Sequence, residues 1–316
     1  VNNYSVTDQS STTADISAKA LTATASASNK TYDGGTTAST TLTFTGLVGS
    51  ETLGQTVGST FDNKNVGSNK TVTVNSITLS DGSGLAANYS ISAGQTTTAN
   101  ITPKALTVSG ITASNKIYDG NTVATLDPIG VTYSGIVPGD SFAGSFSGSF
   151  SDKNIGTGKT VTITSSYSGS DVSNYTVTDQ SSTTANITSR DLEVTGITVF
   201  GLTVNNKEYD GTVTAPLKTD NISYSGLVDG DDFTGSYSGV FANANVGNGK
   251  TVTITSSYSG ADAGNYTVTD QSTTTGNIVP KVLTATASAS NKTYDGGTTA
   301  STTLTFTGLV GSETLG

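Results

Sequence analysis

Acidic and basic side chains are the groups of this 316-residue sequence that could do chemistry, because it contains no histidine, cysteine, methionine or tryptophan. Without histidine and cysteine, the usual zinc, haem and iron–sulfur sites cannot form. Ser-His-Asp triads, Cys-His pairs and disulfides are excluded for the same reason. We therefore expect no catalytic residues and no resident cofactor. The absence of methionine also predicts a segment of a longer chain.

The densest acidic patch suggests a possible calcium site. Asp229, Asp231 and Asp232 are candidate ligands, because Ca²⁺ prefers carboxylate oxygens. The matching positions of the other copies, 48–51 and 138–141, are less acidic, and the full calcium-loop pattern is missing. A solvated loop is the alternative interpretation.

A second possible chemistry is an amide bond between lysine and asparagine side chains, which would strengthen a stalk that has no cysteine. The candidate pairs, each with a lysine near the first strand of a repeat and an asparagine near its last, are Lys30 with Asn100, Lys116 with Asn186, and Lys207 with Asn277. The reaction needs a neutral lysine in an apolar pocket beside a protonated acid. Each lysine here lies beside a polar asparagine and a turn, which disfavours the reaction.

These residues belong to three motifs that recur in a fixed order. Asn-Lys-x-Tyr-Asp-Gly begins at Asn29, Asn115, Asn206 and Asn291; Phe-x-x-x-Asn-(Val/Ile)-Gly-x-x-Lys-Thr-Val-Thr begins at Phe61, Phe150 and Phe241; Asn-Tyr-x-(Val/Ile) begins at Asn3, Asn88, Asn174 and Asn265. Residues 21–54 are also identical to residues 283–316. Internal repetition of this kind indicates a tandem array.

The repeat length of about 87 residues sets the expected domain limits. We predict the C-terminal part of a preceding repeat at residues 1–18 and the N-terminal part of a following repeat at 281–316. Complete repeats are predicted at 19–103 (repeat 1), 104–189 (repeat 2) and 190–280 (repeat 3).

Apolar residues alternate with serine and threonine, as in 160–164, which is typical of strands, and no stretch has a helical period. We expect an all-β fold of tandem immunoglobulin-like β-sandwich domains, each with its own core. β-Grasp-like beads and a β-solenoid are the alternatives. The predicted linkers, such as Thr102-Pro103-Lys104, are very short and indicate a semi-rigid rod.

The motifs also have ordinary structural interpretations. Tyr-Asp-Gly is typical of a turn in which the aspartate caps the backbone and the glycine takes a positive φ. Gly158-Lys159-Thr160 matches only the end of a phosphate loop, so a hairpin turn is predicted. The Thr-x-Thr runs fit an exposed strand face, with an ice-binding array as the alternative.

Together, the motifs resemble the YDG-type repeat of large bacterial surface adhesins, which often accompanies filamentous-haemagglutinin-like secretion domains. The matching blocks are Lys-x-Tyr-Asp-Gly, Asn-Val-Gly-x-x-Lys-Thr-Val, and Asn-Tyr-x-Val with Ala-Asn-Ile-Thr-Pro-Lys, and they recur over essentially the whole chain. The resemblance implies an extracellular, array-forming segment, on a bacterial cell surface or secreted. It implies no catalytic residues.

We therefore expect a structural stalk or fibre segment of an adhesin or surface filament, rather than an enzyme. The alternative is a glycan- or protein-binding module, which would need exposed aromatic residues such as Tyr133, Tyr167, Tyr224 and Tyr237. The expected partners are neighbouring repeats and other copies of the chain in a fibre. The net charge of −10 gives no reason to bind nucleic acid, and no apolar run is long enough for membrane insertion.

Overall fold

The computed structural model describes residues 3–201 and 205–315; Val1, Asn2 and Gly316, at the ends of the outermost predicted segments, lie outside the described residues. The regular structure of the described residues is β-strand, apart from three single-turn 3-10 helices: η1 (Ala86–Asn88), η2 (Val172–Asn174) and η3 (Ala263–Asn265). The prediction of an all-β, repetitive chain is confirmed, and the sheets curl.

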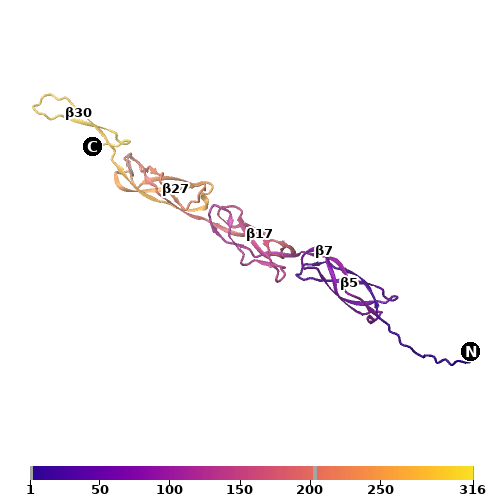
Figure 1. The fold of residues 1–316 in the computed structure, drawn as a ribbon. Helices are drawn as coiled ribbons and strands as arrows, with labels where there is room; N and C mark the ends of the chain where they lie inside the picture. Colours follow the sequence, from indigo (N-terminus) through magenta and orange to yellow (C-terminus); the bar gives the residue numbers. More distant parts are fainter. Residues whose placement is uncertain (1–2, 202–204, 316) are drawn as a thin grey trace. The chain divides into compact units, whose positions relative to one another are not determined.

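The strands recur in the same order along the chain (Figure 1). Repeat 1 contains β1 (Lys19–Ala20), β2 (Thr22–Ala27), β3 (Lys30–Thr31), β4 (Thr37–Ala38), β5 (Thr40–Thr45), β6 (Leu53–Phe61), β7 (Gly67–Asp81), β8 (Tyr89–Ser90) and β9 (Thr96–Thr102). Repeat 2 contains β10 (Lys104–Ser109), β11 (Thr112–Ala113), β12 (Lys116–Ile117), β13 (Val123–Ala124), β14 (Leu126–Asp127), β15 (Thr132–Ser134), β16 (Ala143–Phe150), β17 (Gly156–Ser168), β18 (Tyr175–Thr178) and β19 (Ser182–Thr188). Repeat 3 contains β20 (Arg190–Thr195), β21 (Thr198–Val199), β22 (Asn206–Glu208), β23 (Thr214–Ala215), β24 (Leu217–Lys218), β25 (Ser223–Ser225), β26 (Thr234–Phe241), β27 (Gly247–Ser259), β28 (Tyr266–Thr269) and β29 (Thr273–Val279), and β30 (Thr284–Ala289) and β31 (Thr302–Thr307) follow it.

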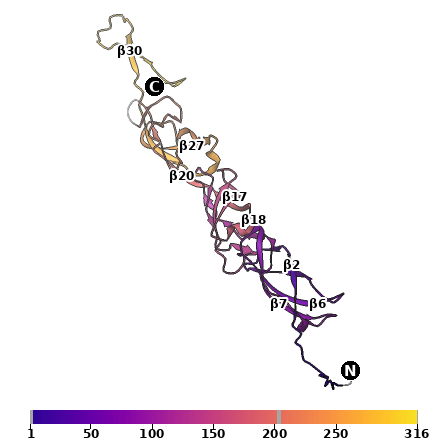
Figure 2. The ribbon, with the colours of Figure 1, turned by 45° about the vertical axis from the view of Figure 1, so that its right-hand side comes forward.

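Each repeat contains one five-stranded sheet, ordered β3-β9-β7-β6-β4 in repeat 1, β12-β19-β17-β16-β13 in repeat 2 and β22-β29-β27-β26-β23 in repeat 3. The long hairpin β6–β7 is the centre of the first of these sheets (Figure 2), and β3 adds to β9 in parallel. Repeats 2 and 3 also have a three-stranded sheet, ordered β15-β10-β18 and β25-β20-β28. The counterpart in repeat 1 is reduced to the pairs β2–β5 and β1–β8.

The linkers between repeats are as short as the sequence predicts. β9 ends at Thr102 and β10 begins at Lys104, so Pro103 alone separates them. Ser189 alone separates β19 from β20. Proline fixes φ near −65°, so the first of these linkers has little conformational freedom.

The compact units of the chain are out of phase with its sequence repeats. Unit 1 consists of Val1–Thr112, Leu126–Ser147 and Ile163–Thr183, which is repeat 1 with the three-stranded sheet of repeat 2. Unit 2 consists of Ala113–Thr125, Gly148–Thr162 and Thr184–Gly316. The division between the units therefore passes through repeat 2.

The hydrophobic core explains why unit 1 crosses a repeat boundary. One buried cluster joins Phe61, Val72 and Ile101 of repeat 1 to Leu106 and Tyr175 of repeat 2. The expectation that each repeat has its own core is wrong at this boundary. Because a single residue links the two repeats, their apolar ends lie in contact and exclude water from each other.

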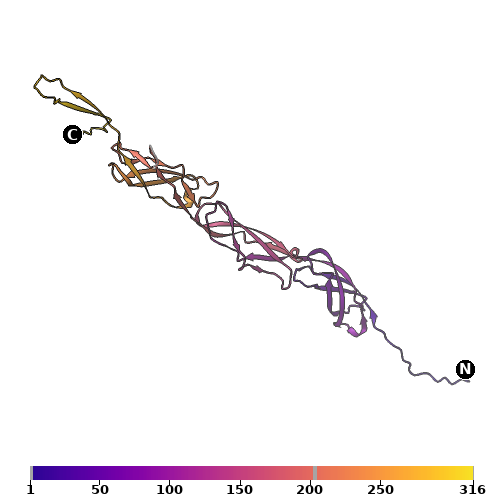
Figure 3. The same cartoon turned by 60° about the vertical axis from the view of Figure 1, so that its left-hand side comes forward.

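The segment after repeat 3 contains the first hairpin of a repeat without the strands that pack on it in repeat 1. β30 and β31 form a hairpin with the same register as β2 and β5, in agreement with their identical sequence (Figure 3). Leu42 of β5 is 3% exposed, whereas the matching Leu304 of β31 is 56% exposed. The hairpin therefore follows from local sequence, and its burial follows from the strands that pack on it.

Candidate functional site at the joints between repeats

The three sequence motifs meet where one repeat follows another. We define joint 1, which lies within unit 1, as the contact between the first and second motifs of repeat 1 and the third motif of repeat 2. Its residues are Tyr32, Lys64, Asn65 and Val66 from repeat 1 and Val137, Asp140, Asp171, Asn174 and Tyr175 from repeat 2.

The first motif places its tyrosine at the end of β3. The Tyr32 N–H donates to Thr102 O at 2.9 Å, which fixes the backbone against β9. Asp33 Oδ1 accepts from the Gly35 N–H at 2.9 Å, and Gly34 has a φ of 80°. The predicted aspartate-capped turn is confirmed, and it recurs with Asp119, Asp210 and Asp295 as acceptors.

The second motif forms the turn between β6 and β7. A strand follows it, where a phosphate loop would have a helix. The hairpin predicted from this motif is present, but Gly158-Lys159-Thr160 lies within β17, after the turn. Asn69 has a φ of 53°, the left-handed conformation that Gly158 and Gly249 adopt at 61° in the other copies. Asparagine tolerates this conformation better than other non-glycine residues. The turn places residues 64–66 toward repeat 2.

Two tyrosine hydroxyls share one carboxylate oxygen in joint 1. Tyr32 Oη donates to Asp140 Oδ2 at 2.8 Å, and Tyr175 Oη donates to the same oxygen at 2.6 Å. Tyr175 Oη also accepts from the Val137 N–H at 2.9 Å. The two rings meet edge to face, with centroids 5.5 Å apart. Tyr32 is 1% exposed, so its hydroxyl has exchanged water for this carboxylate.

A lysine from repeat 1 bridges two aspartates of repeat 2. Lys64 Nζ lies 3.1 Å from Asp140 Oδ1 and 2.8 Å from Asp171 Oδ1. It also lies 5.9 Å from the centroid of the Tyr32 ring, within the range of a cation–π interaction. Asp171 Oδ2 accepts from the Ser141 N–H at 2.9 Å. The ammonium thus lies between two carboxylates and offsets their mutual repulsion.

A buried asparagine completes joint 1. Asn174, which is 1% exposed, accepts from the Val66 N–H at 2.9 Å through Oδ1 and donates to Asn65 Oδ1 at 3.3 Å through Nδ2. Three buried side-chain atoms of the described residues have no partner, namely Gln95 Oε1, Ser165 Oγ and Asn205 Oδ1. None of them lies in joint 1, so its polar network is satisfied.

Joint 2, which lies within unit 2, repeats this arrangement between repeats 2 and 3. The corresponding residues are Tyr118, Lys153, Asn154, Ile155, Val228, Asp231, Asp262, Asn265 and Tyr266. Tyr118 Oη donates to Asp231 Oδ2 at 2.8 Å, and Lys153 Nζ lies 2.7 Å from Asp262 Oδ1. The Tyr118 and Tyr266 rings again meet edge to face at 5.5 Å.

The networks keep their carboxyls ionised and their phenols protonated. Burial opposes the ionisation of Asp140, but hydrogen bonds from Tyr175, Tyr32 and Lys64 outweigh it and lower its pKa. The hydrogen bond from Lys64 is the main cause of the lowered pKa of Asp171. Burial, with the bond to Asp140, raises the pKa of Tyr32, and it raises the pKa of Tyr175 to about 12.

Comparison with protein families gives a match over most of the chain. The YDG domain matches three times, at residues 17–99, 102–185 and 194–275. The chain belongs to the YDG-domain family. Neither the curated proteins nor the solved structures give a match to the chain. The residues that join consecutive YDG repeats therefore include the tyrosine of the motif itself.

The third YDG repeat faces residues 281–316 through a different set of side chains, joint 3. Tyr209 Oη donates to Glu313 Oε1. Ala244 occupies the position of Lys64 and Lys153 in the second motif. This joint therefore keeps the tyrosine–carboxylate contact and lacks the ammonium.

Sequence reasoning missed Lys64 and Lys153, because both stand at an undefined position of the second motif. The available signal was that this position holds lysine in the first two copies and alanine in the third. The acidic partners, Asp140 and Asp231, are more than 70 residues further along the chain. Periodicity within one repeat does not reveal such a contact.

The lysines and asparagines of the predicted amide bonds have separate partners. Each lysine pairs with the aspartate of its own turn at 2.7 Å: Lys30 with Asp33, Lys116 with Asp119, and Lys207 with Asp210. The asparagine Oδ1 atoms accept from backbone N–H groups near the start of β7, β17 and β27: Asn100 from Asn69, Asn186 from Gly158, and Asn277 from Gly249. The amide bonds stay a prediction that intact-mass measurement can test.

Two of the candidate calcium ligands, Asp231 and Asp232, bind protein groups instead. Asp231 binds Tyr118, Tyr266 and Lys153 in joint 2. Asp232 Oδ2 accepts from the Ala261 N–H at 2.9 Å. Among the described residues, no group of three acidic, histidine or cysteine side chains is arranged to hold a metal ion.

The four tyrosines proposed for ligand binding pack inward. Tyr133 and Tyr167 are half-buried against the Val108–Ile111–Ile163 cluster of repeat 2. Tyr224 and Tyr237 are half-buried against the Val194–Ile197–Ile254 cluster of repeat 3. These side chains therefore contribute to the cores of YDG repeats 2 and 3.

Within the described ranges, no helix has the length and apolarity needed to cross a membrane.

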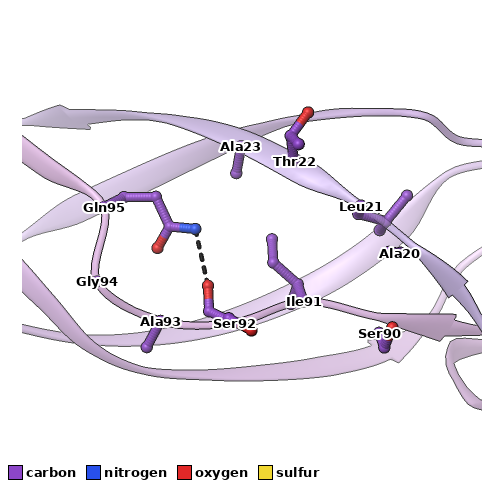
Figure 4. Close-up of a pocket in the computed structure, with 10 residues that line it drawn as sticks. All are labelled: Ala20, Leu21, Thr22, Ala23, Ser90, Ile91, Ser92, Ala93, Gly94 and Gln95. Carbon is purple, nitrogen blue, oxygen red and sulfur yellow. Dashed lines mark hydrogen bonds between the residues drawn. The ribbon is translucent and has the colours of Figure 1, made fainter.

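Repeat 1 has a slit where repeats 2 and 3 have paired strands. Parallel pairing of β10 with β18 continues to Thr107 and Thr178, but the matching pairing in repeat 1 stops where the Leu21 N–H donates to Ser90 O at 2.8 Å. The slit has a volume of about 510 Å³ and lies between β2 and residues 90–95. Figure 4 shows Ile91 and Gln95 pointing into it, with Gln95 Nε2 donating to Ser92 O at 2.8 Å.

Proposed function

We propose that this chain is a structural segment of an extracellular bacterial surface protein, in which YDG repeats act as a semi-rigid stalk. The observation that carries the proposal is the recurrence of one polar network in joints 1 and 2. A hydrogen-bonded network with buried aspartates and tyrosines favours one geometry, because bending the joint would separate these groups from their partners. One-residue linkers support the same conclusion.

The family match and the composition support the setting of this stalk. The motifs resemble repeats of large surface adhesins, and a chain without cysteine needs no redox control outside the cell. We also infer an immunoglobulin-like sandwich for each repeat. Repeats 2 and 3 each have a five-stranded sheet, a three-stranded sheet and a two-stranded sheet, which favours it over a solenoid rung. The absence of an α-helix among the described residues disfavours a β-grasp.

The stiffness of joint 1 can be measured directly, because the chain has no cysteine of its own and spin labels will attach only to the cysteines that are introduced. Spin labels on the exposed positions Ser80 and Ser166, placed by S80C and S166C, span joint 1. A T43C and S80C pair within repeat 1 gives the label-limited width. We expect the two distance distributions to be equally narrow. A cross-joint distribution as broad as that of a flexible linker would overturn the stalk.

The reach of the stalk is a separate measurement. If each repeat is about 40 Å long, three repeats should extend roughly 120 Å. Small-angle X-ray scattering gives the maximum dimension in solution. A compact particle of three clustered repeats would contradict the proposal.

A second candidate function, binding of a glycan or an extended peptide, is favoured by the slit in repeat 1. The unpartnered Gln95 Oε1 and the strand edge beyond Leu21 offer hydrogen bonds to an incoming ligand. A glycan array and a library of Ser/Thr-rich peptides test this role. Binding that A23V abolishes would support it, and an absence of binders would remove it.

A further inference from the structure

The joints differ in a way that matches one face to another. We call the residues that a repeat offers to the next repeat its outgoing face, here Tyr32, Lys64 and Val66. The residues that it offers to the preceding repeat are its incoming face, here Asp140, Asp171, Asn174 and Tyr175. The outgoing faces of repeats 1 and 2 contain lysine, and the incoming faces of repeats 2 and 3 contain two aspartates.

The lysine and the first aspartate that it binds change together. The outgoing face of repeat 3 has Ala244 in place of lysine. Residues 283–316 repeat residues 21–54, so Glu313 stands at the position of Asp140, as Glu51 does in repeat 1; in repeat 1, Leu85 stands at the position of Asp171. Glu313, the copy of Glu51, accepts from Tyr209 in joint 3. The face without a cation therefore meets a glutamate where the lysine-bearing faces meet an aspartate.

From this correspondence we propose that the joints form a charge code, in which each outgoing face is matched to one type of following repeat. A lysine-bearing outgoing face accepts an incoming face with two aspartates, and a lysine-free outgoing face accepts one of the repeat 1 type, which has Glu51 and Leu85. Each face is thus an interaction surface for one class of neighbouring repeat. The code goes beyond the stalk function, since a stalk with interchangeable repeats would be equally stiff.

The two possible mismatches differ in cost. Asp140 is 4% exposed and shares Lys64 with Asp171, so an alanine opposite this pair leaves two nearby carboxylates without a counter-ion. A lysine opposite glutamate and leucine loses less, because Lys64 is 37% exposed and retains water. The code therefore depends mainly on one mismatch, in which a lysine-free face meets the aspartate pair, because this wrong pairing has the higher free-energy cost.

Conversion of joint 1 into the joint 3 type tests the code in the full chain. The single substitution K64A creates the costly mismatch, and K64A with D140E and D171L restores a match. The S80C and S166C spin-label pair reports the order of the joint. We expect a narrow distribution in the wild type, a broad one in K64A with about a 100-fold larger open population, and a narrow one in the triple variant.

Two further variants keep the experiment decisive. K64M removes the charge and keeps the stem, so it should behave as K64A. D140E with D171L, which retains Lys64, should broaden the distribution less than K64A does. Failure of the triple variant to narrow the K64A distribution would overturn the code while leaving the stalk intact. A narrow distribution in K64A would overturn it as well. A broad wild-type distribution would instead overturn the stalk and the code together.

Discussion

The tyrosine of the first motif has two very different surroundings in one chain. Tyr32 and Tyr118 are buried to 1% and 0% exposure by the next repeat, whereas Tyr294 of the C-terminal hairpin is 93% exposed. The turn that follows each of them is the same, with an aspartate cap and a glycine at positive φ. The contribution of this side chain therefore comes from the neighbouring repeat.

Tyr32→Phe should weaken joint 1 without unfolding repeat 1. The change removes the hydroxyl that donates to Asp140 at 2.8 Å and leaves the ring in place. Loss of a hydrogen bond to a buried carboxylate costs about 1.5–3 kcal/mol. Hydrogen exchange at residues 137–140 measures the opening of the joint. Tyr294→Phe is the matched control and should leave exchange unchanged; equal effects of the two substitutions would contradict this account.

The order of joint 1 should be independent of pH between about pH 4 and pH 10. The lowered pKa values of Asp140 and Asp171 give stability that is complete above their ordinary value of 3.8 and is lost as pH falls through the lowered values. The raised pKa of Tyr175 gives stability that is complete below 10.0 and is lost as pH rises through about 12. Spin-label distances across a pH series check both limits. A loss of order near pH 6 would be inconsistent with this network.

At this scale, sequence reasoning succeeded for local contacts and failed for distant ones. The turn was predictable because Asp33 and Gly34 act within three residues. The partner of Tyr32 was not, because Asp140 is 108 residues away in sequence. Its environment depends on which repeat comes next.

Among the elements, the Tyr-Asp-Gly turn is the one that limits how closely two repeats approach. Gly34→Ala should open joint 1, because its φ of 80° is unfavourable for alanine and its Cβ would lie 2.8 Å from Val137 Cγ1. The matched control is Gly296→Ala, which has a φ of 79° and nothing within 4 Å. We expect a broadened S80C–S166C distance distribution for Gly34→Ala and no change for Gly296→Ala. Similar behaviour of both would show that backbone strain alone is responsible.

The slit in repeat 1 has a compositional cause. Ala23 of β2 stands at the position of Val108 of β10, which is 2% exposed in the core of repeat 2. Ala23→Val should therefore stabilise unit 1, by roughly 0.5–1 kcal/mol for partly filled space. Val108→Ala, the reverse change, should cost about 2 kcal/mol. Thermal unfolding followed by circular dichroism measures both; a destabilising Ala23→Val would mean that the slit is a required feature.

The strands themselves were predictable from alternation, but their order in the sheets was not. β7 and β27 match the apolar alternation of the second motif. The parallel addition of β3 to β9 joins residues about 70 positions apart, for which a single sequence has no local signal. Whether the four tyrosines that a binding module would need are exposed was not predictable for a related reason, since period-two alternation gives two faces and does not say which one is buried.

In the molecule as a whole, unit 1 joins repeat 1 to part of repeat 2, and unit 2 joins the rest of repeat 2 to repeat 3. Unfolding of repeat 1 should therefore be coupled to that of the three-stranded sheet of repeat 2. Differential scanning calorimetry should show fewer transitions than there are repeats in the wild type. Lys64→Met should separate an additional transition, because it uncouples the two parts. Three transitions in the wild type, unchanged in the variant, would indicate independent repeats.

The distance of 108 residues between Tyr32 and Asp140 also sets a delay during biosynthesis. At ordinary translation speeds, the carboxylate emerges from the ribosome roughly 5 to 20 s after the phenol that it will bind. During that interval the nascent chain presents an apolar aromatic end to any chaperone or export machinery nearby. Each repeat that uses this joint can complete its packing only after the next repeat has been partly synthesised.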